Sequence, residues 1–462
     1  MRTRSTGTLA AMLLGAALGH STAAGAAGFA LTEHGAQGMG NAFAGGGAVA
    51  EDASAAWFNP AGITRLGTQM QASAHVIAPS FEFTDAGSVQ ALGAGTIPLL
   101  PGAPGINDGG KTALVPNLYY VRKLDERFSV GLAINAPFGL ATEYDRNWKG
   151  RYHAVESEII DLNVNPSIAY KVSDAFSIGG GLSINYIDAK LTNAVDFAAV
   201  CAGLVGGVCP NGAVPGQGAF DGFAENTADD ISFGFNLGLF YEPTANTRLS
   251  LAYRSRINHK LDGQGRFSAP TTLGGFGALG PALGGGLAAT FANTGITTSV
   301  SLPETFSISA YHKVHPKLGL MLDFTRTNWS TVPELRILFD RPGAAGGPGV
   351  EALNWTDTWR YAVGANYYHS DRLTFRTGVA YDETPIPNAA SRTPRLPDND
   401  RLWLSLGASY RVSDRLSADI GYAHLFVDDT PIRRTGSTGS VLIGNYESEA
   451  DLFSVQVNYV FD

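Results

Sequence analysis

A period-two alternation of apolar and small or polar residues recurs many times along this chain. One example is 128–136, in which apolar residues alternate with Ser, Gly, Ala and Asn. A second is 453–461, where apolar residues alternate with Ser454, Gln456 and Asn458. This period is that of a β-strand with two unlike faces. Many such strands in one exported chain indicate a transmembrane β-barrel, apolar outside and polar inside.

The first 26 residues have the pattern of a secretory signal peptide. Arg2 and Arg4 form the charged start, 9–18 the apolar core, and Ala24-Gly25-Ala26 a cleavage site. An uncleaved membrane anchor is the alternative, but this apolar core is too short to cross a bilayer of about 30 Å. We therefore expect an exported mature chain that begins at Ala27.

The composition agrees with a barrel and argues against a nucleic-acid partner. The chain has 57 Gly and only 16% charged residues, which suits tight turns and small lumen-facing side chains. Removing the two signal arginines changes the net charge from −9 to −11, with no basic block to hold phosphates.

The two cysteines, Cys201 and Cys209, predict a disulfide because they lie close together in a Gly-rich stretch of an exported chain. A metal site is the alternative, but neighbouring His or acidic ligands are lacking. The sequence implies no metal and no other cofactor.

The chain divides into a signal peptide at 1–26, a separate N-terminal element at 27–67 and a barrel at 68–462. The N-terminal element is rich in Gly and Ala, lacks sustained alternation and contains the turn signal Asn59-Pro60-Ala61, so short helices and turns are expected. The barrel region predicts fourteen strands. These are 69–84, 112–123, 127–144, 156–172, 175–195, 230–242, 247–267, 296–314, 317–339, 353–369, 372–387, 399–412, 415–432 and 446–461.

Short and long connections alternate between these strands. Outer-membrane barrels have short periplasmic turns and longer outer loops, and an even strand count returns the C-terminus to the periplasmic rim. A water-soluble β-sandwich is the alternative, but its solvent face would carry Lys, Glu and Thr, where this chain has small or neutral residues. The short connections are 125–126, 173–174, 243–246, 315–316, 370–371 and 413–414, and the long ones include 85–111, 196–229 and 268–295.

Three prolines fall inside neighbouring strands. A closed barrel has no edge strand, so a proline within it must lie at a bulge or a gap. Pro116, Pro137 and Pro166 belong to the second, third and fourth strands, and the alternation stops at 135–139 before it resumes. Either Pro116 and Pro166 lie at strand ends, or the barrel wall opens in this sector.

At these residues the chain resembles the long-chain fatty acid transporter family, the FadL-type outer-membrane proteins. The resemblance covers essentially the whole mature chain. The stretches that carry it, in family order, are Ala27-Gly28-Phe29, Asn59-Pro60-Ala61, 138–144, Leu302-Pro303-Glu304, Trp329, 374–378, Pro385-Ile386-Pro387 and 397–401 with Trp403.

The resemblance implies an all-β fold, a fourteen-stranded antiparallel transmembrane barrel with residues 27–67 as a hatch (plug) in the lumen. The hatch motif Asn59-Pro60-Ala61 is expected near the third strand. Hydrophobic ligand would enter a groove between two long loops, reach a deeper pocket and leave sideways at a kink formed by Pro137, Phe138 and Gly139. The groove residues would include Phe197, Val200, Leu204, Leu273, Phe276 and Leu279.

Recognition of a carboxylate is left open by one departure from the family. Fatty-acid binders of the family have basic residues just beyond the fifth strand and just before the tenth. Here those positions are Asn193 and Glu351. Relatives that carry monoaromatic hydrocarbons need no such base, so uncharged hydrocarbons are the alternative ligand. The candidate substitutes for the missing bases are Lys190, Arg254, Arg256 and Arg376.

The remaining chemistry points away from an enzyme and towards a bacterial outer-membrane channel for passive uptake. No nucleophile motif accompanies the histidines, and the acidic pairs Asp229-Asp230 and Asp428-Asp429 are either solvated or contact divalent cations of the outer leaflet.

Expected partners are a fatty acid or hydrocarbon, outer-membrane lipid with lipopolysaccharide, and the barrel assembly machinery, which would read Phe461. We expect a monomer. A structural or adhesin barrel is the alternative class.

Overall fold

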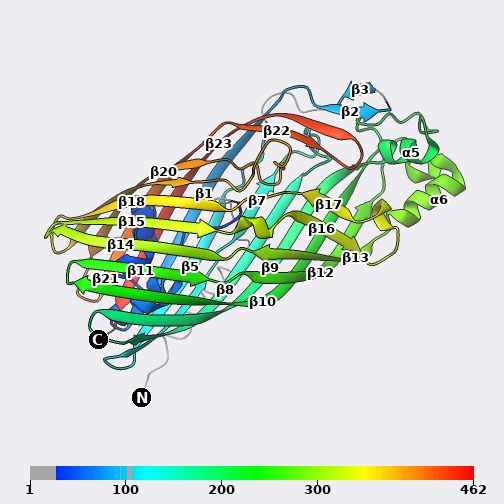
Figure 1. Ribbon diagram of the computed structural model, residues 1–462. Coiled ribbons are helices and arrows are strands. Elements are labelled where there is room, and N and C mark those ends of the chain that lie inside the picture. The colour runs from blue at the N-terminus through cyan, green and yellow to red at the C-terminus, as the bar shows by residue number, and fades with distance from the viewer. Residues whose placement is uncertain (1–27, 94, 101–106, 462) are drawn as a thin grey trace, which may run out of the picture.

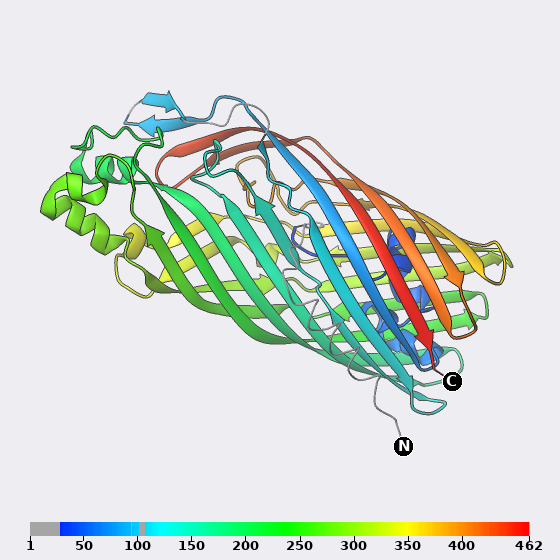
Figure 2. The same ribbon diagram turned by 180° about the vertical axis from the view of Figure 1, so that it is seen from behind.

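The computed structural model describes residues 28–93, 95–100 and 107–461, and these form one closed antiparallel β-barrel (Figure 1). The first wall strand, β1 (Gln69–Asp85), pairs with the last, β23 (Ser440–Val460), and Figure 2 shows the two side by side. Closure leaves no edge strand for uncontrolled pairing. The prediction of a fourteen-stranded barrel is confirmed.

Several wall strands consist of two segments, and four short strands lie in the connections. The wall segments between β1 and β23 are β5 (Ala113–Lys123), β6 (Phe128–Asn135), β7 (Gly139–Glu143), β8 (Glu156–Lys171), β9 (Phe176–Asp196), β10 (Asp221–Thr244), β11 (Thr247–Arg254), β12 (Ile257–Ser268), β13 (Thr294–Leu302), β14 (Thr305–His315), β15 (Leu318–Thr327), β16 (Glu334–Phe339), β17 (Gly349–Ala352), β18 (Thr358–Tyr368), β19 (Leu373–Asp382), β20 (Arg401–Arg411) and β21 (Leu416–Val427). The short strands are β2 (Val89–Leu92), β3 (Gly95–Pro98), β4 (Asn107–Asp108) and β22 (Thr430–Thr435).

The two faces of the wall differ as the alternation predicts. Phe233 of β10 is 71% exposed and Val455 of β23 is 58% exposed, whereas Ser454 and Gln456 are buried inside. Apolar side chains outside match the hydrocarbon of a bilayer, and polar side chains inside line the lumen. Among the described residues, no helix is long and apolar enough to cross a membrane.

The expected long loop at 196–229 is shorter than the sequence predicts. β10 begins at Asp221, not at residue 230, and its first residues pair with β9 from Asp196 onwards. This stretch extends beyond the apolar band, so it needs no lipid-facing side chains and shows no alternation. Likewise β21 ends at Val427, and the following chain forms the separate strand β22 against β23.

Two of the outer connections contain helices at the end of the barrel remote from the C-terminus (Figure 1). α5 (Phe197–Val205) follows β9, whereas η2 (Gly275–Leu279) and α6 (Gly280–Thr290) lie between β12 and β13. Two shorter turns, η3 (Trp329–Thr331) and η4 (Ala344–Gly346), flank β16.

Residues 28–66 lie inside the barrel (blue in Figures 1 and 2) and are largely buried. They form short helices and turns, as expected for a chain segment rich in Gly and Ala. The helices are α2 (Ala36–Gly40), α3 (Gly46–Val49), α4 (Ala55–Phe58) and η1 (Pro60–Arg65).

The Asn59-Pro60-Ala61 motif lies inside the barrel and docks on β9 and β10. The η1 helix that it begins also packs against Ala133 of β6, so the motif is near the third wall strand as expected. Asn59 accepts the Ala61 N–H at 3.0 Å and donates its amide to the Leu239 carbonyl at 3.0 Å. A Cβ added at Gly238 would lie 1.9 Å from the Asn59 side-chain oxygen. The missing side chain of this glycine therefore provides the space for the turn.

Candidate functional site

The third wall strand is broken between β6 and β7. β6 ends at Asn135 and β7 begins at Gly139, and Pro137 between them has no N–H to donate. β6 is paired on both sides, with β5 and β8. β7 is paired with β8, but in the described chain no ladder joins it to β5. The wall is therefore interrupted between β5 and β7.

This interruption of the wall is bounded on both sides. The last β5–β6 pair, Leu118 opposite Ile134, bounds it on one side, and a single bridge between Gly110 and Thr142 bounds it on the other. Pro116 lies on the stretch of β5 between these limits. Pro166 lies elsewhere, in the paired part of β8 opposite Leu132.

The first residues of the hatch cross the interruption, and we call 28–31 the strap. Leu31 donates its N–H to the Pro137 carbonyl at 2.8 Å, and Gly139 donates its N–H to the Phe29 carbonyl at 2.8 Å. Together the two bonds make a one-residue antiparallel bridge. Within the described residues, β5 forms no ladder with β7. The strap instead forms two backbone hydrogen bonds with this part of the wall.

An aromatic cluster holds the strap. The ring centroid of Phe29 lies 5.7 Å from Phe138, 5.0 Å from Trp329 and 5.8 Å from Trp355. Gly28 donates its N–H to Asp398 at 3.1 Å. An added Cβ at Gly28 would lie 2.7 Å from the Trp329 ring, so the backbone approaches this ring as closely as a glycine permits.

An apolar cavity lies beside the strap. Its volume is about 100 Å³. Phe29 of the strap, Leu140 of β7 and Ile159 of β8 form part of its lining, so the cavity adjoins the interrupted wall. Further apolar lining comes from Ile187, Leu261, Ile296, Val300 and Leu353.

A larger cavity, which we call the vestibule, lies towards the α5 and α6 end of the barrel. Its volume is about 880 Å³. Val200 and Leu204 of α5 line it together with Leu287 and Phe291 of the α6 connection. The two cavities adjoin because they share lining residues: Leu191, Asn226, Leu335, Ile337, Glu351 and Arg395.

The six residues expected in a ligand groove fall into three groups. Val200 and Leu204 line the vestibule. Phe197, Phe276 and Leu279 pack instead in a cluster between α5 and the α6 connection, with the Phe197 and Phe276 rings 4.8 Å apart. Leu273 is 45% exposed and lines neither cavity. The two outer loops bury part of their apolar surface against each other, so they are one packed unit.

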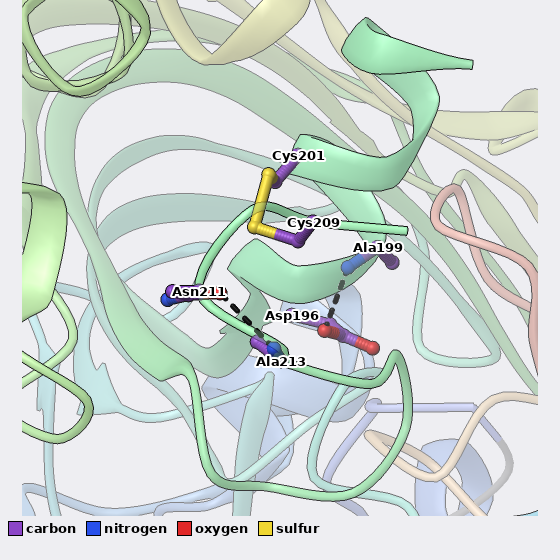
Figure 3. Close-up of a disulfide and its surroundings, with 6 residues drawn as sticks. All are labelled: Asp196, Ala199, Cys201, Cys209, Asn211 and Ala213. Atoms are coloured by element: carbon purple, nitrogen blue, oxygen red, sulfur yellow. Dashed lines mark hydrogen bonds between the residues drawn. A yellow bond between two sulfur atoms is a disulfide. The ribbon is translucent and has the colours of Figure 1, made fainter. Parts of the chain in front are cut away.

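A disulfide between Cys201 and Cys209 ties α5 to the chain that follows it (Figure 3). Asp196 caps the helix by accepting the Ala199 N–H at 2.9 Å. Its other oxygen accepts the Gly216 N–H at 2.6 Å. These links fix the helix that carries Val200 and Leu204 to the vestibule.

Two of the four cations expected to meet a carboxylate lie away from both cavities in surface ion pairs. Lys190 pairs with Glu156 at 2.6 Å, and Arg256 pairs with Glu304 at 3.6 Å. Neither cation lines the apolar cavity or the vestibule.

The other two expected cations hold the hatch. Arg254 lies over the Trp57 ring, 3.3 Å from its centroid, and donates to the Trp57 carbonyl at 2.8 Å. Arg376 donates to the Gln37 side chain at 3.1 Å. Both interactions fasten the hatch to the inner wall, and neither residue lines the apolar cavity or the vestibule.

The cations that do line the vestibule, Arg395 and Arg434, were missed by the sequence analysis. Burial lowers the pKa of the Arg395 guanidinium, and the nearby Glu351 carboxylate partly offsets this effect. Asn193 and Glu351, the two departures from the family pattern, also line the vestibule. The one signal for Arg395 was its place between Pro385-Ile386-Pro387 and 397–401, two of the stretches that carry the family resemblance.

The acidic pair Asp229-Asp230 contacts neighbouring strands. Asp230 lies 2.8 Å from the ring nitrogen of His259, and Asp229 stands opposite Asp262 and Asp188. Within the described ranges, no three His, Cys, Asp or Glu side chains gather in a group that could hold a metal ion.

Comparison with known proteins identifies the family. The family model of outer membrane protein transport proteins (OMPP1/FadL/TodX) matches residues 17–461. The long-chain fatty acid transport protein of Salmonella typhi is 32% identical over 452 residues, covering 96% of each chain. The structure of a Pseudomonas aeruginosa FadL homologue has a TM-score of 0.82 at 26% identity and covers 94% of this chain and 100% of its own.

The fold is shared more widely at lower identity. The Ralstonia pickettii toluene transporter TbuX is 19% identical with a TM-score of 0.62, covering 93% of this chain and 98% of its own. The relatives are transport proteins and not enzymes. This chain therefore belongs to the OMPP1/FadL/TodX family of outer-membrane transport proteins.

Proposed function

We propose that this protein is a passive channel for hydrophobic molecules, with long-chain fatty acids as its favoured ligand. The observation that carries the proposal is the continuous series of vestibule, apolar cavity and interrupted wall. The relatives that are about 31% identical over 96% of the chain are long-chain fatty acid transport proteins, which supports this choice of ligand.

The ligand enters the vestibule beside α5 and α6 and passes into the apolar cavity where the two share their lining. The hatch fills the barrel below, so the path along the barrel axis is closed to an apolar chain. The ligand instead leaves sideways past Leu140 and Ile159 once the strap moves off β7. A side exit into lipid spares the alkyl chain contact with water and with the polar lumen.

Two other functions fit the fold less well. Uptake of monoaromatic hydrocarbons would use the same route, but the toluene transporter of similar fold is 19% identical and supports the fold alone. A structural or adhesin barrel needs neither the adjoining cavities nor the strap. We further propose that the outer rim contacts lipopolysaccharide and that the protein acts as a monomer.

Replacing Gly139 with Arg tests the side exit. Gly139 lies at the interruption, where its N–H binds the Phe29 carbonyl of the strap, so a long charged side chain there would crowd the exit. Uptake of radiolabelled oleic acid by cells carrying Gly139→Arg should fall to the level of cells without the protein. Binding of oleic acid to the purified variant should remain, because the vestibule is unchanged.

Gly139→Ala is the matched control and should retain uptake, because a methyl group leaves the passage open. Insertion of both variants is verified by heat-modifiable migration in gels. Normal uptake by the inserted Arg variant would return the ligand route to the lumen.

A further inference from the structure

Two arginines and one glutamate meet where the apolar cavity joins the vestibule. Glu351 and Arg395 line both cavities, and Arg434 lines the vestibule. The three side chains come from three separate parts of the chain: the β17 strand, the β19–β20 connection and β22. Each arginine is 11% exposed and Glu351 is 20% exposed, so the cluster is partly withdrawn from water.

In each guanidinium, one nitrogen donates hydrogen bonds to protein oxygens. Another nitrogen of the same group lies near the Glu351 carboxylate. Nη1 of Arg395 donates to the Ser157 hydroxyl at 3.0 Å, and its Nε lies 3.4 Å from Glu351. Nη1 of Arg434 donates to the Ala352 carbonyl at 2.8 Å, and its Nη2 lies 3.6 Å from Glu351. Charge-assisted hydrogen bonds are shorter, about 2.7–2.9 Å, so Glu351 is held loosely by both arginines.

The cluster has a net charge of +1, because two guanidinium groups face one carboxylate. Other charged groups that line the two cavities are already engaged: Glu334 pairs with Arg336 at 2.6 Å, and Asp196 caps α5. His153 also lines the vestibule, and burial lowers its pKa to about 4, so it is neutral at pH 7. A partly buried cation in excess favours an incoming anion.

We propose that Arg395 and Arg434 form the carboxylate seat for the ligand and that Glu351 occupies this seat when no ligand is bound. The inference rests on the proposed uptake function and specifies its substrate class as amphiphiles with an anionic head. The alkyl chain lies in the apolar cavity while its carboxylate binds the arginines at the junction. Glu351 is then an internal competitor that the ligand carboxylate displaces.

Binding of oleic acid and of its methyl ester to purified protein in mild detergent tests this seat, because the two differ in charge at the head alone. The wild type should bind the acid more tightly than the ester. In Arg395→Gln the affinity for the acid should fall about tenfold, as expected when one charge-assisted hydrogen bond is lost, with the ester unchanged. In Glu351→Gln the acid should bind about tenfold more tightly, because its competitor is gone.

Lys190→Gln is the control, since this cation precedes a cavity-lining residue but pairs with Glu156 outside both cavities, and it should change neither affinity. Thermal unfolding gives a second readout. Glu351→Gln leaves two buried cations without their partner, so oleic acid should raise its melting temperature more than that of the wild type.

The outcomes separate the two proposals. Equal binding of acid and ester by the wild type, or weaker binding of the acid by Glu351→Gln, overturns the carboxylate seat and leaves hydrophobic uptake standing. A wild type that binds neither compound overturns both. A preference for the acid that survives Arg395→Gln and Arg434→Gln overturns the assignment to these arginines.

Discussion

At the scale of single residues, Glu33 next to the strap should make docking of the hatch depend on pH. Its side chain is 1% exposed, and one carboxyl oxygen has no hydrogen-bond partner among the described residues. Burial raises the pKa of Glu33 from 4.5 to about 7, against the smaller opposing effects of Arg401 and Arg360. The stabilisation that goes with the neutral carboxyl is complete below pH 4.5 and is lost as the pH rises through about 7.

Glu33→Gln should remove this dependence. Above pH 7 the variant should hold the hatch more firmly than the wild type, by about 3 kcal/mol, and below pH 4.5 the two should behave alike. Hydrogen exchange of residues 28–35, followed by mass spectrometry across this pH range, measures the difference. His34, whose pKa burial lowers, is present in both proteins, so its contribution cancels. Parallel pH curves for the two proteins would show that Glu33 does not control docking.

At the scale of elements, the hatch and the barrel are held by different kinds of contact. The barrel consists of long ladders, whereas the hatch is attached by side chains such as Arg254, Arg376 and Asn59 and by the bridge of the strap. Deleting 28–66 should therefore leave a barrel that folds, with raised permeability to small polar solutes because the lumen is no longer filled. Liposome swelling measures the permeability, and gel migration before and after heating measures folding. A deletion variant that never reaches the membrane would assign the hatch a role in assembly.

The wall strands could be predicted from the sequence because the surroundings of each strand determine its residue pattern. In 128–135, lipid on one side and lumen on the other impose the alternation locally, with no knowledge of the neighbours required. The start of β10 at Asp221 could not be read in this way, because strand residues beyond the apolar band face no lipid and need no alternation of apolar and polar side chains. The docking of Asn59 against Gly238 was also hidden, since nothing local reveals which wall strand a buried turn contacts.

The carboxylate-binding candidates show the same limit. Lys190 directly precedes the cavity-lining Leu191, and side chains of adjacent strand residues point to opposite faces, so the lysine faces outwards. Arg395, Arg434 and Glu351 come from the β19–β20 connection, β22 and β17, and no sequence periodicity shows that these three segments meet. The sequence identifies the basic residues, but only the folded structure shows which of them line a cavity.

At the scale of the whole molecule, the C-terminus completes the barrel and presents an aromatic side chain at its rim. Phe461 donates its N–H to the Thr68 carbonyl at 2.8 Å, next to the seam between β1 and β23, and its side chain is 40% exposed. We expect Phe461→Ala to lower the amount of inserted barrel, because assembly machinery reads a terminal aromatic residue. Fractionation of outer membranes and quantitative blotting measure insertion. Removing Asp462, which lies outside the described residues, should have little effect, and unchanged insertion of the Ala variant would exclude this role for Phe461.

Release of the strap from β7 and unfolding of the barrel are expected to occur on different timescales. The seam from Gln69 opposite Val460 to Asp85 opposite Gly444 must break cooperatively, so we expect the barrel to resist heat and detergent for long periods. Release of the strap would break only two backbone hydrogen bonds and the packing of Phe29, so we expect it to recur many times within the lifetime of the folded barrel. A high melting temperature would therefore say nothing about how often the proposed side exit opens. Substitutions that slow transport need leave no trace in the unfolding curve.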